Sequence, residues 1–272
     1  MYLAILSSLP IRAKKNFTMK SKESWVPSRF LLKNGHLTAS RDGSNVGIGS
    51  RLIVDITAKY YQTYIPGHVK GRLLDLGCGN VPLYEMYKDY ILDNICVDWE
   101  NTLHENKYVD ITCDLSGNLP LEDEQFETII LSDVMEHLPN PEKLWKEMFR
   151  LLVPGGKVLL NVPFLYWIHE APYDYCRYTE FAIKRFAELS GFSIILLEPI
   201  GGAPEVLADI SSKVFARYTL GKWIAVSIQY LTCLALKTKI IKRLSKKTSE
   251  LFPLGYFIIA EKPELIKPPA LV

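Results

Sequence analysis

Short apolar runs alternate with polar or amphipathic stretches through most of this chain. The runs that we predict to be strands cover residues 71–76, 91–97, 126–131, 157–162, 194–199 and 251–261. Apolar side chains predominate in these runs and polar residues are few, which is typical of largely buried strands. Residues 51–65 carry apolar and aromatic side chains at helical spacing, and Asn140-Pro141 predicts the start of another helix. Strands alternating with helices predict an α/β protein with a mostly parallel sheet.

The strand at 71–76 leads into a glycine-rich turn that reads GRLLDLGCGNVP over residues 71–82. Gly77 and Gly79 allow the backbone to turn tightly and to approach a ligand closely, which a β-carbon would obstruct. Asp75 places a carboxylate near the end of the strand. Ligands of open α/β sheets bind outside the carboxyl ends of the strands, so this turn is a candidate nucleotide pocket.

Acidic residues follow the next two apolar runs. Asp98, in Val97-Asp98-Trp99, comes about twenty residues after the glycines, where a carboxylate can accept hydrogen bonds from ribose hydroxyls. Asp114, in Cys113-Asp114-Leu115, follows a third short run, and its carboxylate can accept a hydrogen bond from an adenine amino group.

The order of these motifs resembles that of class I S-adenosylmethionine-dependent methyltransferases. DLGCG, the acidic end of the second strand, Asp-Leu, DVMEHLPNP and RLLVPGG follow one another within residues 52–200, and the resemblance resumes at the C-terminus. It implies a Rossmann-like sheet of seven strands, mostly parallel with the last strand antiparallel, flanked by helices, with a helical insertion before the last strand. It also implies S-adenosylmethionine as the cofactor, bound by Asp75, Gly77, Cys78, Gly79, Asp98, Trp99, Asp114, Leu115 and Asp133.

One position departs from the pattern of that family, which often has a third glycine two residues after Gly79. Val81 occupies this position, and Pro82 after it suits the first turn of a helix. We expect the β-carbon of Val81 to narrow the space beside the amino-acid part of the cofactor.

A long polar-aromatic loop over residues 161–180 supplies the catalytic candidates His169, Asp174 and Arg177. His169 has a pKa suited to removing the acceptor proton, and Asp174 can orient its ring or act as the base. Arg177 can hold an anionic acceptor, although it can instead pair with Asp174 to shape the loop. The pattern is similar to that of bacterial methyltransferases from polysaccharide and surface-glycan gene clusters, through His169, Pro172, Asp174, Arg177 and Thr179.

Asp133, Glu136 and His137 form a second constellation, because they lie within one helical turn. This spacing can hold a divalent cation, and some class I methyltransferases place Glu-x-x-Glu-His here. Three ligands without a fourth are thin evidence, so we expect no metal and interpret Glu136 and His137 as capping a helix and lining the cofactor pocket.

Composition and charge set the broad class. The chain has 272 residues, 48% of them hydrophobic, and a net charge of +2, which argues against a nucleic-acid partner. Its five cysteines are unclustered, which favours buried thiols in a reduced cytoplasm over disulfides. Residues 11–50 are polar and aperiodic, so we expect a loosely ordered N-terminal arm over 1–50, followed by one methyltransferase domain over 51–272.

The expected insertion, residues 203–249, differs in composition from the rest of the chain. From 210 to 249 it has nine basic residues and no acidic one, and residues 223–236 are nearly all apolar. A helix of that length is about 21 Å long, too short for a hydrocarbon core of about 30 Å. The insertion is therefore either a lid packed on the domain or a peripheral contact with an anionic membrane.

We therefore expect an enzyme that transfers a methyl group to an oxygen or nitrogen of a saccharide, a lipid-linked glycan or another small-molecule acceptor. The glycan acceptor rests on the resemblance alone, and a quinone-like acceptor is the nearest rival. Two alternatives from other classes stay open: an NAD-dependent oxidoreductase or epimerase, and a catalytically silent binding subunit, which only Val81 favours. The sequence carries no signal for an oligomeric state.

Overall fold

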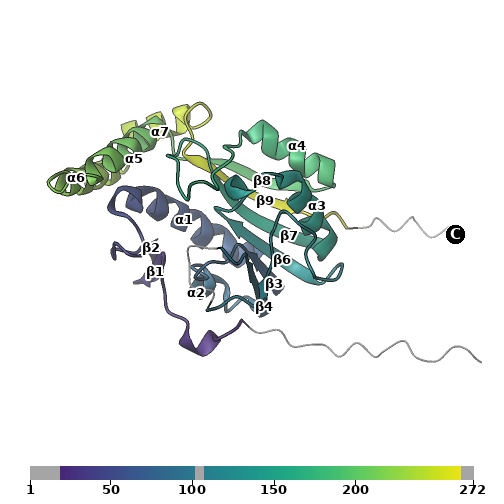
Figure 1. Ribbon diagram of the computed structural model, residues 1–272. Coiled ribbons are helices and arrows are strands. Elements are labelled where there is room, and N and C mark those ends of the chain that lie inside the picture. Colours follow the sequence, from purple (N-terminus) through teal and green to yellow (C-terminus); the bar gives the residue numbers. More distant parts are fainter. Residues whose placement is uncertain (1–18, 102–106, 265–272) are drawn as a thin grey trace, which may run out of the picture.

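The computed structural model describes residues 19–101 and 107–264, and within them seven strands form one sheet (Figure 1). The order across the sheet is β5-β4-β3-β6-β7-β9-β8. β9 runs antiparallel to both of its neighbours, whereas the pairs from β5 to β7 are parallel. This confirms the expected methyltransferase-type sheet. The strands are β3 (Gly71–Leu76), β4 (Ile91–Asp98), β5 (Ile111–Thr112), β6 (Phe126–Ser132), β7 (Leu152–Pro163), β8 (Ser193–Ile200) and β9 (Gly255–Glu261).

Helices cover both faces of this sheet. Because successive side chains of a strand point to opposite faces, the two middle residues of β3 enter different cores. Leu73 packs in the cluster that includes α1 (Arg51–His68), and Leu74 packs in the cluster that includes α3 (Pro141–Leu151) and α4 (Glu180–Ser190). A short helix, α2 (Tyr84–Tyr87), follows the glycine-rich turn. Each fully buried aliphatic side chain contributes about 1.5–3 kcal/mol, so these two cores hold the strand ends in place.

The described part of the N-terminal arm is ordered, contrary to expectation. β1 (Phe30–Lys33) and β2 (His36–Ala39) form an antiparallel hairpin, preceded by the 3-10 turn η1 (Lys22–Ser24) and followed by η2 (Ile48–Ser50). The hairpin turns at Asn34-Gly35, both with positive φ, as a tight two-residue turn requires. It rests on α1, where the backbone amide of Ala39 donates to Asp55 (2.7 Å). Residues 19–50 are therefore part of the folded domain, and residues 1–18 lie outside the described residues.

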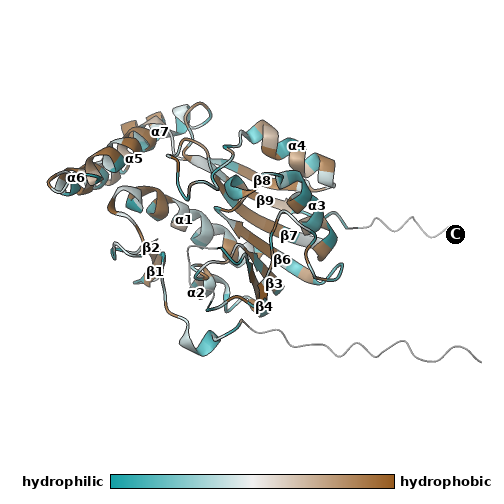
Figure 2. Cartoon of the chain, viewed as in Figure 1, coloured by the Kyte–Doolittle hydropathy of each residue, from teal (hydrophilic) through white to brown (hydrophobic). Residues whose placement is uncertain are grey.

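The insertion forms three helices at one end of the sheet, α5 (Ala203–Ala216), α6 (Gly221–Ala235) and α7 (Lys239–Thr248) (Figure 1). The expected helical insertion before the last strand is thus confirmed. Apolar residues are spread along the outer sides of α5 and α6 (Figure 2). No single helix among the described residues is long and apolar enough to cross a membrane. α6 and α7 pass that test of length and composition only together, and the chain bends by 100° between them.

Candidate active site

A cavity of about 560 Å³ lies at the carboxyl ends of the parallel strands, between them and the N-terminal segment. This volume lies within the range of small-molecule and cofactor sites. The sheet determines where the cavity lies, because β3, β4, β6 and β7 all end at its rim. The loops that follow these strands line the cavity. The nine residues that we expected to bind the cofactor all line it, namely Asp75, Gly77, Cys78, Gly79, Asp98, Trp99, Asp114, Leu115 and Asp133.

The glycine-rich turn is tied to the end of β4. The backbone amides of Gly77 and Cys78 donate to the carbonyl of Val97 (2.8 and 3.1 Å), and that of Gly79 donates to Asp98 Oδ2 (2.8 Å). Gly77 has a φ of 66°, and a β-carbon on it would lie 2.4 Å from Val134. Glycine is therefore required at this position by both backbone conformation and space.

Two carboxylates below the turn differ in environment. Asp98 Oδ1 also accepts from the amide of Trp99 (2.8 Å), so backbone donors orient its side chain toward the cavity. Asp75 is 5% exposed and accepts a hydrogen bond from the hydroxyl of Tyr87 (3.1 Å). Burial raises the pKa of Asp75 to about 7, against the opposing effect of the Tyr87 hydrogen bond. Asp75 is thus poised to change charge near neutrality.

Val81 does not narrow the cavity, contrary to expectation. It is fully buried in the core on the α1 side and is absent from the cavity lining. Its backbone has a φ of 49°, a left-handed conformation that is uncommon for a β-branched residue, and its carbonyl accepts a hydrogen bond from Trp25 Nε1 (3.2 Å). Because of this backbone conformation, the side chain of Val81 points away from the cavity. Val81 therefore no longer favours the alternative of a catalytically silent binding subunit.

Asp133 is held from two sides. Arg29 Nη2 lies 2.8 Å from Asp133 Oδ2, and the side-chain amide of Asn161 on β7 donates to Oδ1. Arg29 and neighbouring residues of the N-terminal segment line the cavity, which sequence analysis did not foresee. The only signal in the sequence was the hairpin dipeptide Asn34-Gly35, which predicts order in this segment.

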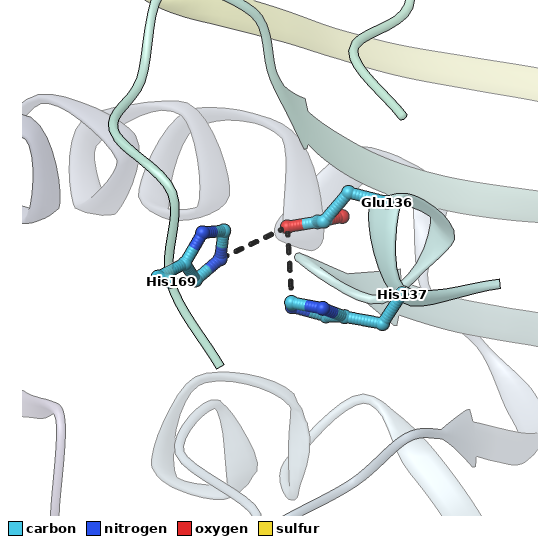
Figure 3. Close-up of side chains that lie close together, drawn as sticks. All are labelled: Glu136, His137 and His169. Carbon is cyan, nitrogen blue, oxygen red and sulfur yellow. Dashed lines mark ion pairs between the residues drawn. The ribbon is translucent and has the colours of Figure 1, made fainter. Parts of the chain in front are cut away.

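The long loop brings His169 beside Glu136 and His137, although 33 positions separate it from Glu136 in the sequence (Figure 3). His169 Nε2 lies 3.6 Å from Glu136 Oε1, and His137 Nε2 lies 3.8 Å from the same oxygen. Glu136 is fully buried, and neither carboxylate oxygen has a hydrogen-bond partner among the described residues. Both imidazoles line the cavity. Carboxylate and imidazoles thus converge at one wall of the pocket.

The charges of this cluster depend on one another. Burial raises the pKa of Glu136, and the neighbouring His169 opposes the shift. Burial lowers the pKa of His169, but the ion pair with Glu136 and the Asp174 carboxylate outweigh it, so the net direction is upward. The Arg177 guanidinium lowers the pKa of Asp174 to about 2.

Asp174 and Arg177 do not line the cavity. Asp174 Oδ2 accepts the backbone amide of His169 (2.9 Å) and lies 3.4 Å from His169 Nδ1, so it stands behind the ring. The guanidinium of Arg177 is bonded to both oxygens of Asp174 and to the carbonyl of Trp167 (3.0 Å). These contacts correspond to the alternative in which the pair shapes the loop, and they leave Arg177 turned away from any acceptor in the pocket.

The sheet order, the glycine turn and the acidic residues on the rim are those of the class I methyltransferase fold. The carboxylates of Asp98 and Asp114 share one cavity with the glycine-rich turn, and these acceptors suit a ligand with hydroxyl and amino groups. In agreement, residues 74–160 match the family described as Methyltransferase domain. This match argues against the NAD-dependent alternative.

Two curated enzymes are also similar to this chain in sequence. A demethylmenaquinone methyltransferase from Renibacterium salmoninarum is 27% identical over 115 residues, which cover 40% of this chain and 45% of that enzyme. A ubiquinone biosynthesis O-methyltransferase from Coxiella burnetii is 23% identical over 200 residues, covering 62% of this chain and 85% of that enzyme. The chain spans less than half the length of the first curated relatives that it matches.

Solved structures agree on the fold. A SAM-dependent methyltransferase from Archaeoglobus fulgidus superposes with a TM-score of 0.52 at 20% identity, covering 77% of this chain and 93% of the other. At this identity the likeness concerns the arrangement of the chain, whereas chemistry has to be argued from the site.

Proposed function

We propose that this protein transfers a methyl group from S-adenosylmethionine to an oxygen, or a nitrogen, of a small-molecule acceptor. The observation that carries the proposal is that the glycine-rich turn and the imidazoles of His137 and His169 line a single cavity. Direct methyl transfer requires the methyl donor and the acceptor to lie side by side, with a group nearby that helps the acceptor to lose its proton. A single cavity lined by the turn and by the two imidazoles meets both requirements.

The cofactor half is assigned to the turn and the acidic rim. Gly77 to Gly79 would hold the methionine part, Asp98 the ribose hydroxyls and Asp114 the adenine amino group. When bound, the sulfonium supplies an electrophilic methyl group, so the protein has to align the acceptor and help it to lose a proton. The acceptor oxygen forms the new bond to carbon as the carbon–sulfur bond breaks and its electron pair stays on sulfur.

The acceptor half is assigned to the Glu136–His137–His169 cluster. This cluster would stabilise loss of the acceptor proton, and Asp174 would position His169 from behind through its contacts with the ring and the backbone amide. Asp174 is therefore proposed as a positioning residue, and Arg177 as the residue that holds Asp174 in place.

For the acceptor we propose a hydroxyl on a lipid-linked molecule, a glycan or a quinone-like compound. The support comes from the basic helical surface, which we define as α5 to α7. Leu220, Trp223 and Ile240 are 83%, 77% and 79% exposed there, amid the basic residues of 210–249. Apolar side chains with a basic surround suit an anionic membrane surface. Lys213 of α5 lies over the ring of Tyr166, which lines the cavity, so this surface adjoins the site.

Calorimetric titration with S-adenosylmethionine, S-adenosylhomocysteine and NAD tests the cofactor half. We expect micromolar binding of the two sulfur compounds and no signal for NAD, whereas NAD binding alone would overturn the proposal. Transfer of radiolabelled methyl groups to a lipid extract, and separately to a water-soluble saccharide fraction, tests the acceptor. Label only in the saccharide fraction would refute a lipid-linked acceptor.

A further inference from the structure

We propose that Glu136, His137 and His169 bind a divalent transition-metal ion at the wall of the cavity. One ligand atom from each residue lies within 4.8 Å of the other two, and all three converge as Figure 3 shows. The inference rests on the proposed function, because it assigns the ion a part in activating the acceptor.

The ring of His137 has its unprotonated nitrogen directed at Glu136. His137 Nδ1 lies 2.8 Å from the carbonyl oxygen of Tyr173, and a carbonyl can only accept, so Nδ1 carries the proton. In the neutral ring the lone pair is then on Nε2, which faces Glu136 Oε1. Histidines that bind metals commonly donate their second ring N–H to a backbone carbonyl in this way.

His169 has a comparable orientation, with a carboxylate instead of a carbonyl near Nδ1, although its Nδ1 makes no hydrogen bond among the described residues. Its Nδ1 faces Asp174 Oδ2 at 3.4 Å, and its Nε2 faces Glu136 Oε1 at 3.6 Å. Asp174 is in turn fixed by Arg177 through bonds to both of its oxygens. A carboxylate behind a histidine orients the ring and raises its basicity as a metal ligand.

Glu136 supplies the independent reason to expect a cation. Its side chain is fully buried, and both oxygens lack a hydrogen-bond partner among the described residues. A buried carboxylate without hydrogen bonds is costly, and the two imidazoles near it lie beyond hydrogen-bond distance, so a cation shared by the three groups would offset the cost. The separations of 3.6 and 3.8 Å exceed a hydrogen bond but approach the spacing of about 3–3.5 Å between ligands that share an ion at about 2.0–2.2 Å.

The ligand set also indicates which ions fit. Two imidazoles and one carboxylate suit Zn²⁺, Co²⁺, Fe²⁺ or Mn²⁺ better than Ca²⁺ or Mg²⁺, which prefer oxygen ligands. The sequence had suggested a ligand set that contains Asp133. In the structure Asp133 is paired with Arg29, and His169 is the third ligand instead. Sequence spacing could not bring His169 into the set.

Three protein ligands leave coordination positions open, and both histidines line the cavity, so the open positions face the acceptor. An acceptor hydroxyl on the ion would lose its proton to solvent more readily, since a bound cation lowers the pKa of an oxygen ligand. His169 would then act as a ligand rather than as the base that sequence analysis expected.

Metal binding can be measured apart from turnover. Tag-free protein is stripped with EDTA, dialysed and titrated with Co²⁺ under reducing conditions, with visible absorption and calorimetry as readouts. The variants are His137→Gln, His169→Gln and, as a matched control, His36→Gln on an exposed strand position outside the cavity. Thermal melts and S-adenosylmethionine affinity of each variant show that it is folded.

We expect one equivalent of Co²⁺ in the wild type and in His36→Gln, displaced by Zn²⁺, and at least a tenfold loss of affinity in His137→Gln and His169→Gln. Stripped wild-type protein that binds S-adenosylmethionine but no Co²⁺ below millimolar concentration would overturn the metal site and leave the methyltransferase proposal intact. Equal Co²⁺ affinity in wild type and His169→Gln would also overturn it. Failure of S-adenosylmethionine to bind in any sample would instead contradict the proposed function.

Discussion

Arg29 and Asp133 form an ion pair, with Arg29 Nη2 2.8 Å from Asp133 Oδ2, and it joins the segment before β1 to the residue that follows β6. Both residues line the cavity, so the contact makes the N-terminal segment one wall of the site. Asp133 is also in a left-handed conformation with a φ of 54°, and the bond from Asn161 holds it there. The described part of the arm that we expected to be loosely ordered therefore contributes to the pocket.

Arg29→Ala should loosen this wall. It leaves the Asp133 carboxylate, whose side chain is 17% exposed, without its cationic partner, which costs about 1–3 kcal/mol of folding free energy. The urea concentration at the midpoint of unfolding and the affinity for S-adenosylmethionine should both decrease. Arg41→Ala, which removes a more exposed pair with Asp55, is the control. If both variants unfold at the same urea concentration, the ion pair does not hold the segment.

Gly77→Ala should weaken cofactor binding more than tenfold. The left-handed backbone costs an alanine about 1–2 kcal/mol, and its β-carbon would also meet Val134 at 2.4 Å. Gly43→Ala is a suitable comparison, because nothing lies within 4 Å of a β-carbon there. Calorimetry on the two variants checks the prediction, and unchanged affinity in Gly77→Ala would contradict the placement of the turn at the ligand.

Asp98→Ala should reduce S-adenosylmethionine affinity at least tenfold, since it removes the acceptor that both positions Gly79 and is proposed to hold the ribose. Asp93 lies on the same strand but outside the cavity, where it pairs with Arg72. Asp93→Ala should therefore bind the cofactor like the wild type. Equal losses in the two variants would point to a general weakening of β4 instead.

The raised pKa of Asp75 predicts a pH dependence of stability. With a pKa near 7 in the folded state and near 3.9 in the unfolded state, the folded protein holds the extra proton between these values. This contribution is present at low pH and is lost as the pH rises toward 7, by at most about 1.4 kcal/mol per pH unit. Asp75→Asn should remove this contribution. The difference in free energy of unfolding between the wild type and Asp75→Asn should therefore change between pH 4 and 7 and stay constant above pH 7. A constant difference would refute the prediction.

Binding to anionic vesicles should depend on the basic helical surface. Trp223→Ser removes a side chain that is 77% exposed, and it should lower co-sedimentation with phosphatidylglycerol vesicles several-fold without affecting cofactor affinity. Leu92→Ser is the matched control, because Leu92 is 87% exposed on β4, away from this surface. No binding of the wild type to such vesicles would exclude the membrane contact.

The sheet could be predicted from sequence because buried strands and glycine turns are local patterns. Helix caps are also local: Thr179 precedes α4, and its side chain accepts the amide of Ala182 (3.3 Å). Asn140-Pro141 correctly predicts the start of α3, yet the side chain of Asn140 makes no capping bond. Composition favours such caps, but the backbone angles at the position decide whether the side chain can reach.

The site was predictable only where it follows the strand ends. Asp98 and Asp114 lie on the cavity because strand order places them there, whereas the pairing of His169 with Glu136 depends on the path of a long loop. The role of Val81 was misjudged because a left-handed backbone turned its side chain into the core. Side-chain direction in turns depends on φ and ψ, which the motif alone does not specify.

The position of β9 between β7 and β8 has a consequence for how the domain assembles during synthesis. β8 has no bond to β7 and joins the sheet only through residues 255–261, as in the pairings Asn161↔Phe257 and Glu198↔Phe257. The helices α5 to α7 are therefore synthesised before β9, and the sheet is complete only when β9 has been made. Until then β7 keeps an open edge beside the nascent pocket, and β8 has no strand to pair with.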